Sequence, residues 1–140
     1  MAVMDAALRD SVRLILSETP ETLTDATIND PLVGGAAEAR VLGWVGEPAY
    51  ELRPPGEQAQ IRQAIAYLTA SIVVGLRRWT YAMKSEKFGE TYAYTTGELN
   101  VSSWITDLER AATEALGSLM QKASAYPKVT FFTTASGRRG

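Results

Sequence analysis

Apolar side chains recur every three or four residues through the middle of this chain, over a stretch long enough to dominate its fold. This spacing predicts one face of an α-helix that runs from residue 57 to residue 83. Such a helix would be roughly 40 Å long at 1.5 Å per residue. The apolar positions are Ile61, Ile65, Leu68, Ile72, Leu76, Trp79 and Met83. The pattern therefore favours an all-α fold, a small helical bundle around one long central helix.

Small residues line an adjacent face of the same predicted helix, at Ala64, Ser71, Gly75 and Ala82. Glycine inside a helix costs stability unless another backbone packs close to it. We therefore expect a neighbouring helix to cross at Gly75. That helix belongs to the same subunit in the favoured interpretation and to another subunit in the alternative.

Two shorter helices are predicted before the central one. The first spans residues 4–17 and should end before Thr19-Pro20, because proline lacks the amide that the next turn needs. The second spans residues 24–46, with Thr24 as N-cap and a break near Asp30-Pro31. Gly34 and Gly35 each weaken this helix by roughly 1 kcal/mol relative to alanine. The apolar faces comprise Met4, Leu8, Val12 and Ile15, and then Val33, Ala37, Val41 and Trp44; Gly46-Glu47-Pro48 ends the second helix.

A last helix is predicted over residues 101–124, capped by Asn100, Ser102 or Ser103. Its apolar face comprises Val101, Trp104, Ile105, Leu108, Ala112, Ala115, Leu116 and Leu119. Two segments do not fit helices. Residues 84–98, rich in threonine and tyrosine between glycines, suggest an extended loop between the last two helices. Residues 126–140 contain the strand-like run Val129–Thr134, an isolated β arm that needs a partner strand from its own domain or another chain.

Composition removes many kinds of chemistry. The 140 residues contain no cysteine and no histidine. These absences exclude disulfides, thiolate zinc sites, the Ser-His-Asp triad and the commonest general base near neutral pH. We therefore expect a non-enzymatic protein without cofactor or metal, folded as one helical domain over residues 1–125 with the arm attached.

Charge is divided unevenly along the chain. Residues 1–60 carry ten acidic and four basic side chains, and residues 61–140 carry six and ten. Neither half is basic enough to predict a nucleic-acid clamp. The uncharged stretch Ile65–Leu76 is too short to span a bilayer, so the sequence predicts a soluble, unsecreted protein without a membrane partner.

Several polar groups allow a second interpretation. Carboxylates at Glu86 and Glu90, or at Asp107, Glu109 and Glu114, could hold a divalent metal, but no ligand motif accompanies them and helix-surface charges are favoured. Arg77-Arg78 could contact phosphate, although cations near a helix C-terminus have an ordinary structural use. Tyr92 and Tyr94 could stack on bases. A small helical DNA-binding or DNA-packaging subunit and a metal-dependent enzyme therefore remain as alternatives.

The order of these elements resembles a known family. A capped helix from Thr24-Asp25, a long apolar helix, the segment Lys84-Ser85-Glu86-Lys87-Phe88-Gly89-Glu90 with Tyr92 and Tyr94, and a final helix are similar to the head-tail connector (adaptor) proteins of long-tailed bacteriophages. The resemblance covers residues 24–125, and the Lys-Ser-Glu segment is its most specific part. The helix before Thr19, the Gly34-Gly35 pair and the length of the tail depart from the family pattern.

The resemblance implies a structural protein of the virion neck, which assembles in the host cytoplasm as a ring beneath the portal protein, usually a dodecamer. The ring would extend the channel through which packaged DNA passes without sequence-specific binding, and it would contact the next neck or tail protein. The implied projecting loop comprises Lys84, Ser85, Glu86, Lys87, Phe88, Gly89, Glu90, Tyr92 and Tyr94. The implied portal-binding arm comprises Val129, Thr130, Phe131, Phe132, Thr133 and Thr134.

For a single arm of this kind, the favourable and unfavourable contributions to the free energy of binding would nearly cancel. Ordering six residues costs about 6–12 kcal/mol. Ladder hydrogen bonds return about 1 kcal/mol each, and burial of Phe131 and Phe132 returns about 1.5–3 kcal/mol each. Coupling many arms in a ring raises the effective concentration of each. We therefore expect a monomer or weak oligomer in free solution.

Overall fold

The computed structural model describes residues 3–81 and 93–120. This part of the chain forms α1 (Ala6–Leu16), α2 (Asp25–Asn29), α3 (Gly34–Val45), a 3-10 turn η1 (Tyr50–Leu52), α4 (Pro55–Leu76) and α6 (Ala93–Leu116). Short helical stretches follow α4 and α6, at residues 78–81 and 118–120. The described residues contain helices and no strand, which confirms the all-α prediction for them. The predicted β arm lies outside the described residues.

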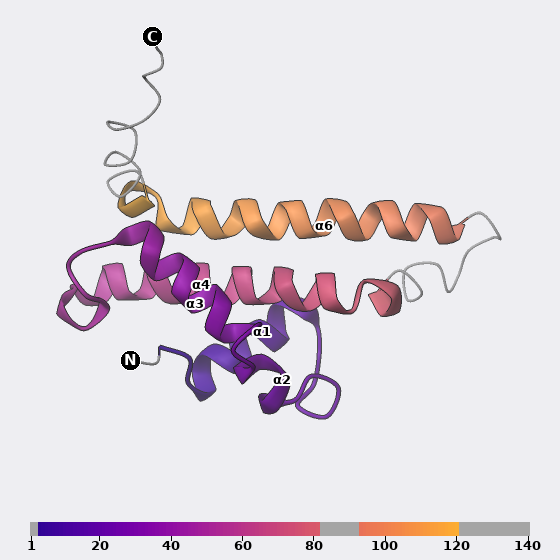
Figure 1. Cartoon of the computed structure of the whole chain (residues 1–140), viewed down its shortest axis with the longest axis horizontal. Helices are drawn as coiled ribbons and strands as arrows, with labels where there is room; N and C mark the ends of the chain where they lie inside the picture. Colours follow the sequence, from indigo (N-terminus) through magenta and orange to yellow (C-terminus); the bar gives the residue numbers. More distant parts are fainter. Residues whose placement is uncertain (1–2, 82–92, 121–140) are drawn as a thin grey trace, which may run out of the picture.

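The long helices α4 and α6 run antiparallel, side by side, and form the backbone of the fold (Figure 1). Helices α1 and α3 pack on other sides of α4, so α4 is the central helix that the sequence predicted. Its residues Ile61, Ile65 and Leu68 are fully buried. The other large, fully buried apolar side chains come from each of the α-helices and from Leu23 in the loop between α1 and α2; those in helices are Val12, Ile28, Val41, Val73, Val74 and Leu116.

The apolar face predicted for residues 57–83 is only partly buried. Leu76 and Trp79 remain 67% and 63% exposed, which corrects the expectation that this face is continuous. Leu76 is exposed as the last residue of α4, and Trp79 follows a break in the helix at Arg77, whose backbone (φ −108°, ψ 29°) is not helical. The next helical residues therefore point in new directions, and Tyr81 becomes buried. Met83 lies outside the described residues.

The neighbouring helix expected at Gly75 is α6. A Cβ atom built on Gly75 would lie 3.9 Å from Ile105 Cδ1, an ordinary van der Waals distance. The crossing is therefore confirmed within one subunit, but it leaves room for a methyl group, so close backbone contact does not require glycine here.

The predicted helix over residues 24–46 is two helices. Thr24 caps α2 as expected, since its Oγ1 accepts a hydrogen bond from Thr27 N at 3.4 Å. The break falls at Asp30, whose carboxylate accepts from Leu32 N at 2.8 Å. Pro31, Leu32 and Val33 form a turn, so α3 begins at Gly34 instead of Pro31. At the other end Gly46 adopts φ +63°, a conformation that favours glycine and ends α3 where the sequence predicted.

Gly34 has a structural role that the sequence analysis did not assign to it. A Cβ atom at this position would lie 2.2 Å from the carbonyl oxygen of Ile28 and 3.0 Å from Met4 Cε. The first distance is far below any van der Waals contact, so only glycine lets the start of α3 pack against the end of α2. The lower helix propensity of glycine at this position is therefore outweighed by the clash that an alanine would make.

Helix α6 begins at Ala93, eight residues before the predicted start at Val101. Tyr94 and the rest of residues 93–98 are thus helical and do not belong to an extended loop, which corrects that prediction. The β propensity of threonine and tyrosine depends strongly on context, so it did not predict the conformation of this segment. Because α6 starts earlier than predicted, the expected caps Asn100, Ser102 and Ser103 lie inside it.

The C-terminal end of α6 also differs from the prediction. The helix ends at Leu116, and Gly117 follows with φ +53°. The predicted apolar face is confirmed, because Val101, Leu108, Ala112, Leu116 and Leu119 are buried while Trp104, Ile105 and Ala115 are partly buried. Residues 121–124 lie outside the described residues.

Helix α4 is longer than the uncharged stretch on which the membrane prediction rested. By length and composition it could cross a bilayer, but 56% of the relevant window is buried. Because α1, α3 and α6 pack around it, α4 has the environment of a core helix.

Candidate functional site

Most of the residues predicted to be functional lie outside the described residues. These are seven consecutive loop residues, Lys84 to Glu90, with Tyr92, and the six arm residues Val129 to Thr134. Tyr94 alone is placed, in the first turn of α6. Neither the projecting loop nor the portal-binding arm is therefore tested by the described residues.

The carboxylates considered for a metal do not gather in the described part of the chain. Across residues 3–81 and 93–120 no group of three or more acidic side chains could hold a metal ion. Asp107 instead pairs with Arg110 one turn later, at 3.2 Å between Oδ1 and Nη1. Glu109 and Glu114 are exposed on α6, and Glu86 and Glu90 lie outside the described residues.

The arginine pair at the end of α4 connects elements of the bundle. Arg77 Nη1 donates a hydrogen bond to Thr22 O at 2.8 Å, which joins the end of α4 to the loop after α1. Arg78 Nη2 donates to Ser102 Oγ at 2.8 Å, which joins it to α6. Both guanidinium groups, which were considered as phosphate contacts, therefore form hydrogen bonds within the bundle.

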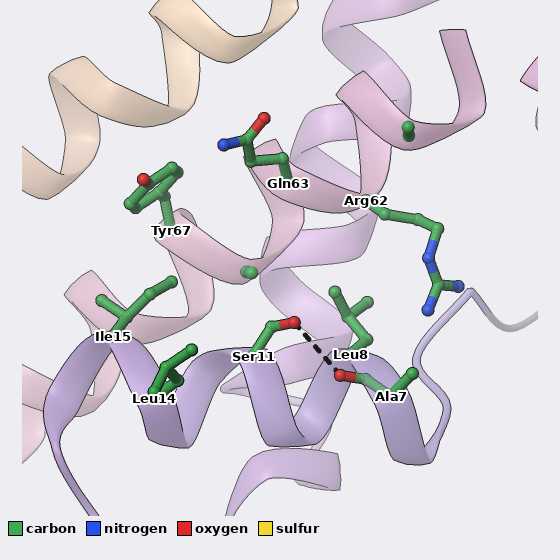
Figure 2. A pocket seen from close by; sticks show the side chains of 10 residues that line it. Ala7, Leu8, Ser11, Leu14, Ile15, Arg62, Gln63 and Tyr67 are labelled. Carbon is green, nitrogen blue, oxygen red and sulfur yellow. Dashed lines mark hydrogen bonds between the residues drawn. The ribbon is translucent and has the colours of Figure 1, made fainter. Parts of the chain in front are cut away.

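A groove between α1 and α4 is the candidate binding site that the structure offers. It has a volume of about 460 Å³ and a mostly apolar lining (Figure 2). Leu14 and Ile15 lie along α1 and Tyr67 rises from α4 beside them, while Leu14 is 81% exposed. The full lining, here called the α1/α4 groove, comprises Ala7, Leu8, Ser11, Leu14, Ile15, Ala59, Arg62, Gln63, Ala66 and Tyr67.

The α1/α4 groove has few polar side chains, and two of them form hydrogen bonds within the fold. Ser11 Oγ donates to Ala7 O at 3.1 Å, as Figure 2 shows. Arg62 forms two hydrogen bonds to the Asp5 carboxylate, at 2.8 and 3.1 Å. Arginine is the only titratable residue of the lining apart from Tyr67. The groove can therefore bind an apolar group with a few polar neighbours, and it lacks a nucleophile and a general base.

Asp5 holds one end of this groove together. Its Oδ1 accepts from Leu8 N at 3.0 Å, so Asp5 is the N-cap of α1, and its carboxylate also receives Arg62 from α4. The hydrogen bond from Arg62, followed by that from the Leu8 amide, lowers the pKa of Asp5 from 3.8 to about 2. Asp5 thereby fixes both the start of α1 and its contact with α4.

This shift predicts a dependence of stability on pH. Because the pKa of Asp5 is lower in the folded state, the Asp5–Arg62 ion pair stabilises the fold above about pH 4, and this stabilisation is lost as the pH falls towards 2. The Asp5 side chain is 57% exposed, so solvent screening limits the effect to about 0.5–1 kcal/mol. We expect Asp5→Asn, which keeps the cap acceptor, to lower the free energy of unfolding by this amount at pH 7 and by much less at pH 2, where about half of the Asp5 carboxyl is protonated. Urea titration at both pH values measures it, and an equal loss at both would contradict the charge argument.

Arg13 forms a second buried polar contact that the sequence analysis did not find. Its Nε donates to Leu23 O at 2.7 Å, and its Nη2 donates to the carboxylate of Asp25 at the start of α2. The guanidinium of Arg13, with help from Arg9, lowers the pKa of Asp25. In the sequence, only the position of Asp25 directly after the N-cap Thr24 indicated a structural role for this carboxylate. Its partner Arg13 lies in another helix, so local spacing could not identify the pair.

A second hollow, of about 610 Å³, lies where α1 meets α3, and its charges also serve the fold. Arg9 Nε lies 3.3 Å from Asp25 Oδ1, and Arg9 Nη1 donates to Asn29 Oδ1 at 3.4 Å. The Glu38 carboxylate accepts from the backbone amides of Val3 and Met4. The charged groups of this hollow therefore join α1 to α2, and α3 to the segment before α1.

Tyr81 joins the far end of the long helix pair to the loop after α1. Its hydroxyl donates to Glu18 Oε2 at 2.5 Å, and its ring packs edge to face on Trp104 with 5.4 Å between centroids. Burial, and then the neighbouring Glu18 carboxylate, raise the pKa of Tyr81, so this hydroxyl stays protonated and donates. The contact is structural.

The described residues thus offer an apolar groove and several structural ion pairs, without a constellation of groups for catalysis. Comparison with protein-family models, with curated proteins and with solved structures gave no match.

Proposed function

We propose that this chain is a head-tail adaptor, a structural subunit of the neck of a long-tailed bacteriophage virion. In this proposal it assembles as a ring beneath the portal protein, with twelve copies expected. The ring extends the DNA channel without reading its sequence, and it offers a surface to the next neck or tail protein. The projecting loop and the portal-binding arm are the contact segments.

The observation that carries this proposal is the projection of the α4–α6 pair. Its far end extends past α1, α2 and α3, and the two helices are joined there by residues 82–92 (Figure 1). Helix α4 has 22 residues, so it carries this connection about 33 Å from its own start. Most of the proposed loop is thus attached at the tip of a stiff two-helix support, which suits a segment that contacts another protein.

The use of charge in the bundle also favours a structural role. The ion pairs Asp5–Arg62 and Arg53–Glu57 each join elements of the fold, at 2.8 and 3.1 Å. Catalytic sites usually gather titratable groups with perturbed pKa values in one cleft. Here the residues with shifted pKa values lie in separate contacts between helices. This distribution supports an assembly protein more than an enzyme.

Portal binding tests the proposal directly. We expect the full chain to be retained by a portal from the same phage, and we expect deletion of residues 127–140 to weaken retention at least tenfold. Far-UV circular dichroism should show that the deletion variant keeps its helices. The full-length double variant Phe131→Ser, Phe132→Ser provides a second reading if the deletion variant does not fold. Unchanged binding by both variants would refute the portal-binding arm.

The state of the free subunit gives a further check. Native mass spectrometry at micromolar concentration should show a monomer or weak oligomer, and addition of portal should produce a ring visible by electron microscopy. A stable dodecamer without portal would contradict the argument that these contributions to the free energy of binding nearly cancel for a single arm. Tight duplex binding that falls steeply with added salt would instead favour the DNA-packaging alternative.

A further inference from the structure

We propose that in the free subunit the α1/α4 groove binds the C-terminal segment of the same chain, with Val129, Phe131 and Phe132 as the apolar contacts. The inference goes beyond the proposed function, because it concerns the protein before any portal is met. It rests on three observations: the groove has an exposed apolar surface, the chain that follows α6 is long enough to span the distance to it, and that segment and the rest of the chain have opposite net charges.

The first observation is the uncovered apolar surface of the groove. Leu14 is 81% exposed, the most exposed large apolar side chain of the described residues, and it lies beside Ile15 and Tyr67 in the lining. Burying an apolar side chain of this size contributes about 1.5–3 kcal/mol. An extended segment with aromatic residues would cover Leu14 and bury its own apolar groups at the same time.

The second observation is where the chain leaves the bundle. Gln60 Nε2 donates to Ala115 O and Leu116 O, at 3.3 and 3.4 Å, which fixes the end of α6 against the first half of α4. The groove residues Ala59 and Gln63 lie one and three positions from Gln60 on the same helix. The nine residues from 121 to 129 can span up to about 30 Å. The α4 side of the groove, from Ala59 to Tyr67, is only about 12 Å long.

The third observation is charge. Residues 121–140 contain four basic side chains and no acidic one, whereas residues 1–120 contain ten basic and sixteen acidic side chains. The segment therefore carries +4 and the rest of the chain −6. Asp10 pairs with Arg13 at 3.2 Å but keeps a side chain that is 75% exposed, and it lies on α1 within one turn of both Ala7 and Leu14. This electrostatic attraction favours binding of the segment to the groove. Because the segment is covalently attached, its effective concentration at the groove is already in the millimolar range.

A self-bound segment would also shield its apolar residues until a partner competes for them. A portal would then have to displace the segment from the α1/α4 groove. The expected consequence is that weakening the groove contact exposes the segment without damaging the bundle, which separates this inference from the portal experiment.

Trypsin cleavage after Lys128 tests the inference in the full chain. Leu14→Asp puts a charge into the groove at an exposed position, and Leu32→Asp puts the same charge at a 79% exposed position outside it. We expect Leu14→Asp, and separately the double variant Phe131→Ser, Phe132→Ser, to raise the initial cleavage rate at Lys128 at least fivefold. Leu32→Asp should leave the rate unchanged.

Amide NMR spectra identify the surface involved. Relative to the unchanged protein, the Phe131→Ser, Phe132→Ser variant should shift amide resonances of Ser11, Leu14 and Tyr67, independently of protein concentration. Shifts that appear only as concentration and mass rise would assign the groove to the segment of a second copy, and would overturn the proposal. Equal cleavage rates in all variants, with no shifts in the groove, would also overturn it. The two proposals can fail separately. The chain could bind its own segment in these experiments without binding a portal, or it could bind a portal without binding its own segment.

Discussion

Gly34→Ala should lower the free energy of unfolding by about 3 kcal/mol, one of the two largest effects expected of a single substitution in this protein. The new methyl group would lie 2.2 Å from the carbonyl oxygen of Ile28, and a backbone atom cannot move aside as a side chain does. Overpacking a tight contact typically costs about 1–3 kcal/mol. To relieve the clash, α3 must shift away from the end of α2, because moving the flexible Met4 side chain frees only the second of the two close distances.

The neighbouring glycine provides a matched control. A Cβ atom on Gly35 would meet Asp30 O and Pro31 Cβ at 3.8 Å, which is ordinary contact. Alanine also favours a helix over glycine by up to about 1 kcal/mol. Gly35→Ala should therefore leave stability unchanged or raise it slightly. Urea denaturation followed by circular dichroism measures both variants, and an equal response at the two positions would show that the Ile28 contact does not matter.

Arg53→Met should cost about 3 kcal/mol through a different mechanism. Arg53 is 6% exposed, and its guanidinium donates to Val45 O at 3.1 Å, Gly46 O at 3.3 Å and Pro48 O at 3.0 Å. It also pairs with Glu57 at 3.1 Å. Carbonyl groups at the C-terminus of α3 have no partners within the helix, and Arg53 supplies them. Methionine fills the space but leaves these carbonyls and the Glu57 carboxylate without their donor. The Val45 carbonyl is buried, and an unpaired buried acceptor costs about 1–3 kcal/mol, whereas the part-buried groups can bind water instead.

Two comparisons define what Arg53 does. Arg53→Lys should recover less than half of the loss, since one ammonium group cannot reach carbonyls on several sides as a planar guanidinium does. Arg40→Met, at an exposed position on α3, should change stability by less than about 0.5 kcal/mol. Thermal unfolding of the three variants measures the order. Full rescue by lysine would show that the positive charge, and not the set of hydrogen bonds, is what stabilises this loop.

The candidate site was only partly accessible to reasoning from the sequence. Local composition predicted an extended segment and a strand-like run, and the resemblance implied their roles as projecting loop and portal-binding arm; all of these site residues except Tyr94 lie outside the described residues. The α1/α4 groove was not predicted, because its lining combines residues more than forty positions apart. Leu14 in particular lies off the apolar face that the sequence assigned to the first helix, so only the packing of α1 on α4 identifies its surroundings.

The sequence by itself determined which segments are helical and where prolines, caps and glycines interrupt them, since these are local properties of spacing and backbone. It therefore indicated the end of α1 near Ser17, the Thr24 cap, the break at Asp30 and the end of α3 at Gly46. The tertiary structure alone decided what depends on distant partners. The necessity of Gly34 follows from a carbonyl in another helix. The burial of Arg53 follows from several carbonyls that only the folded chain brings together, because a residue's free energy depends on its neighbours in space more than on its neighbours in sequence.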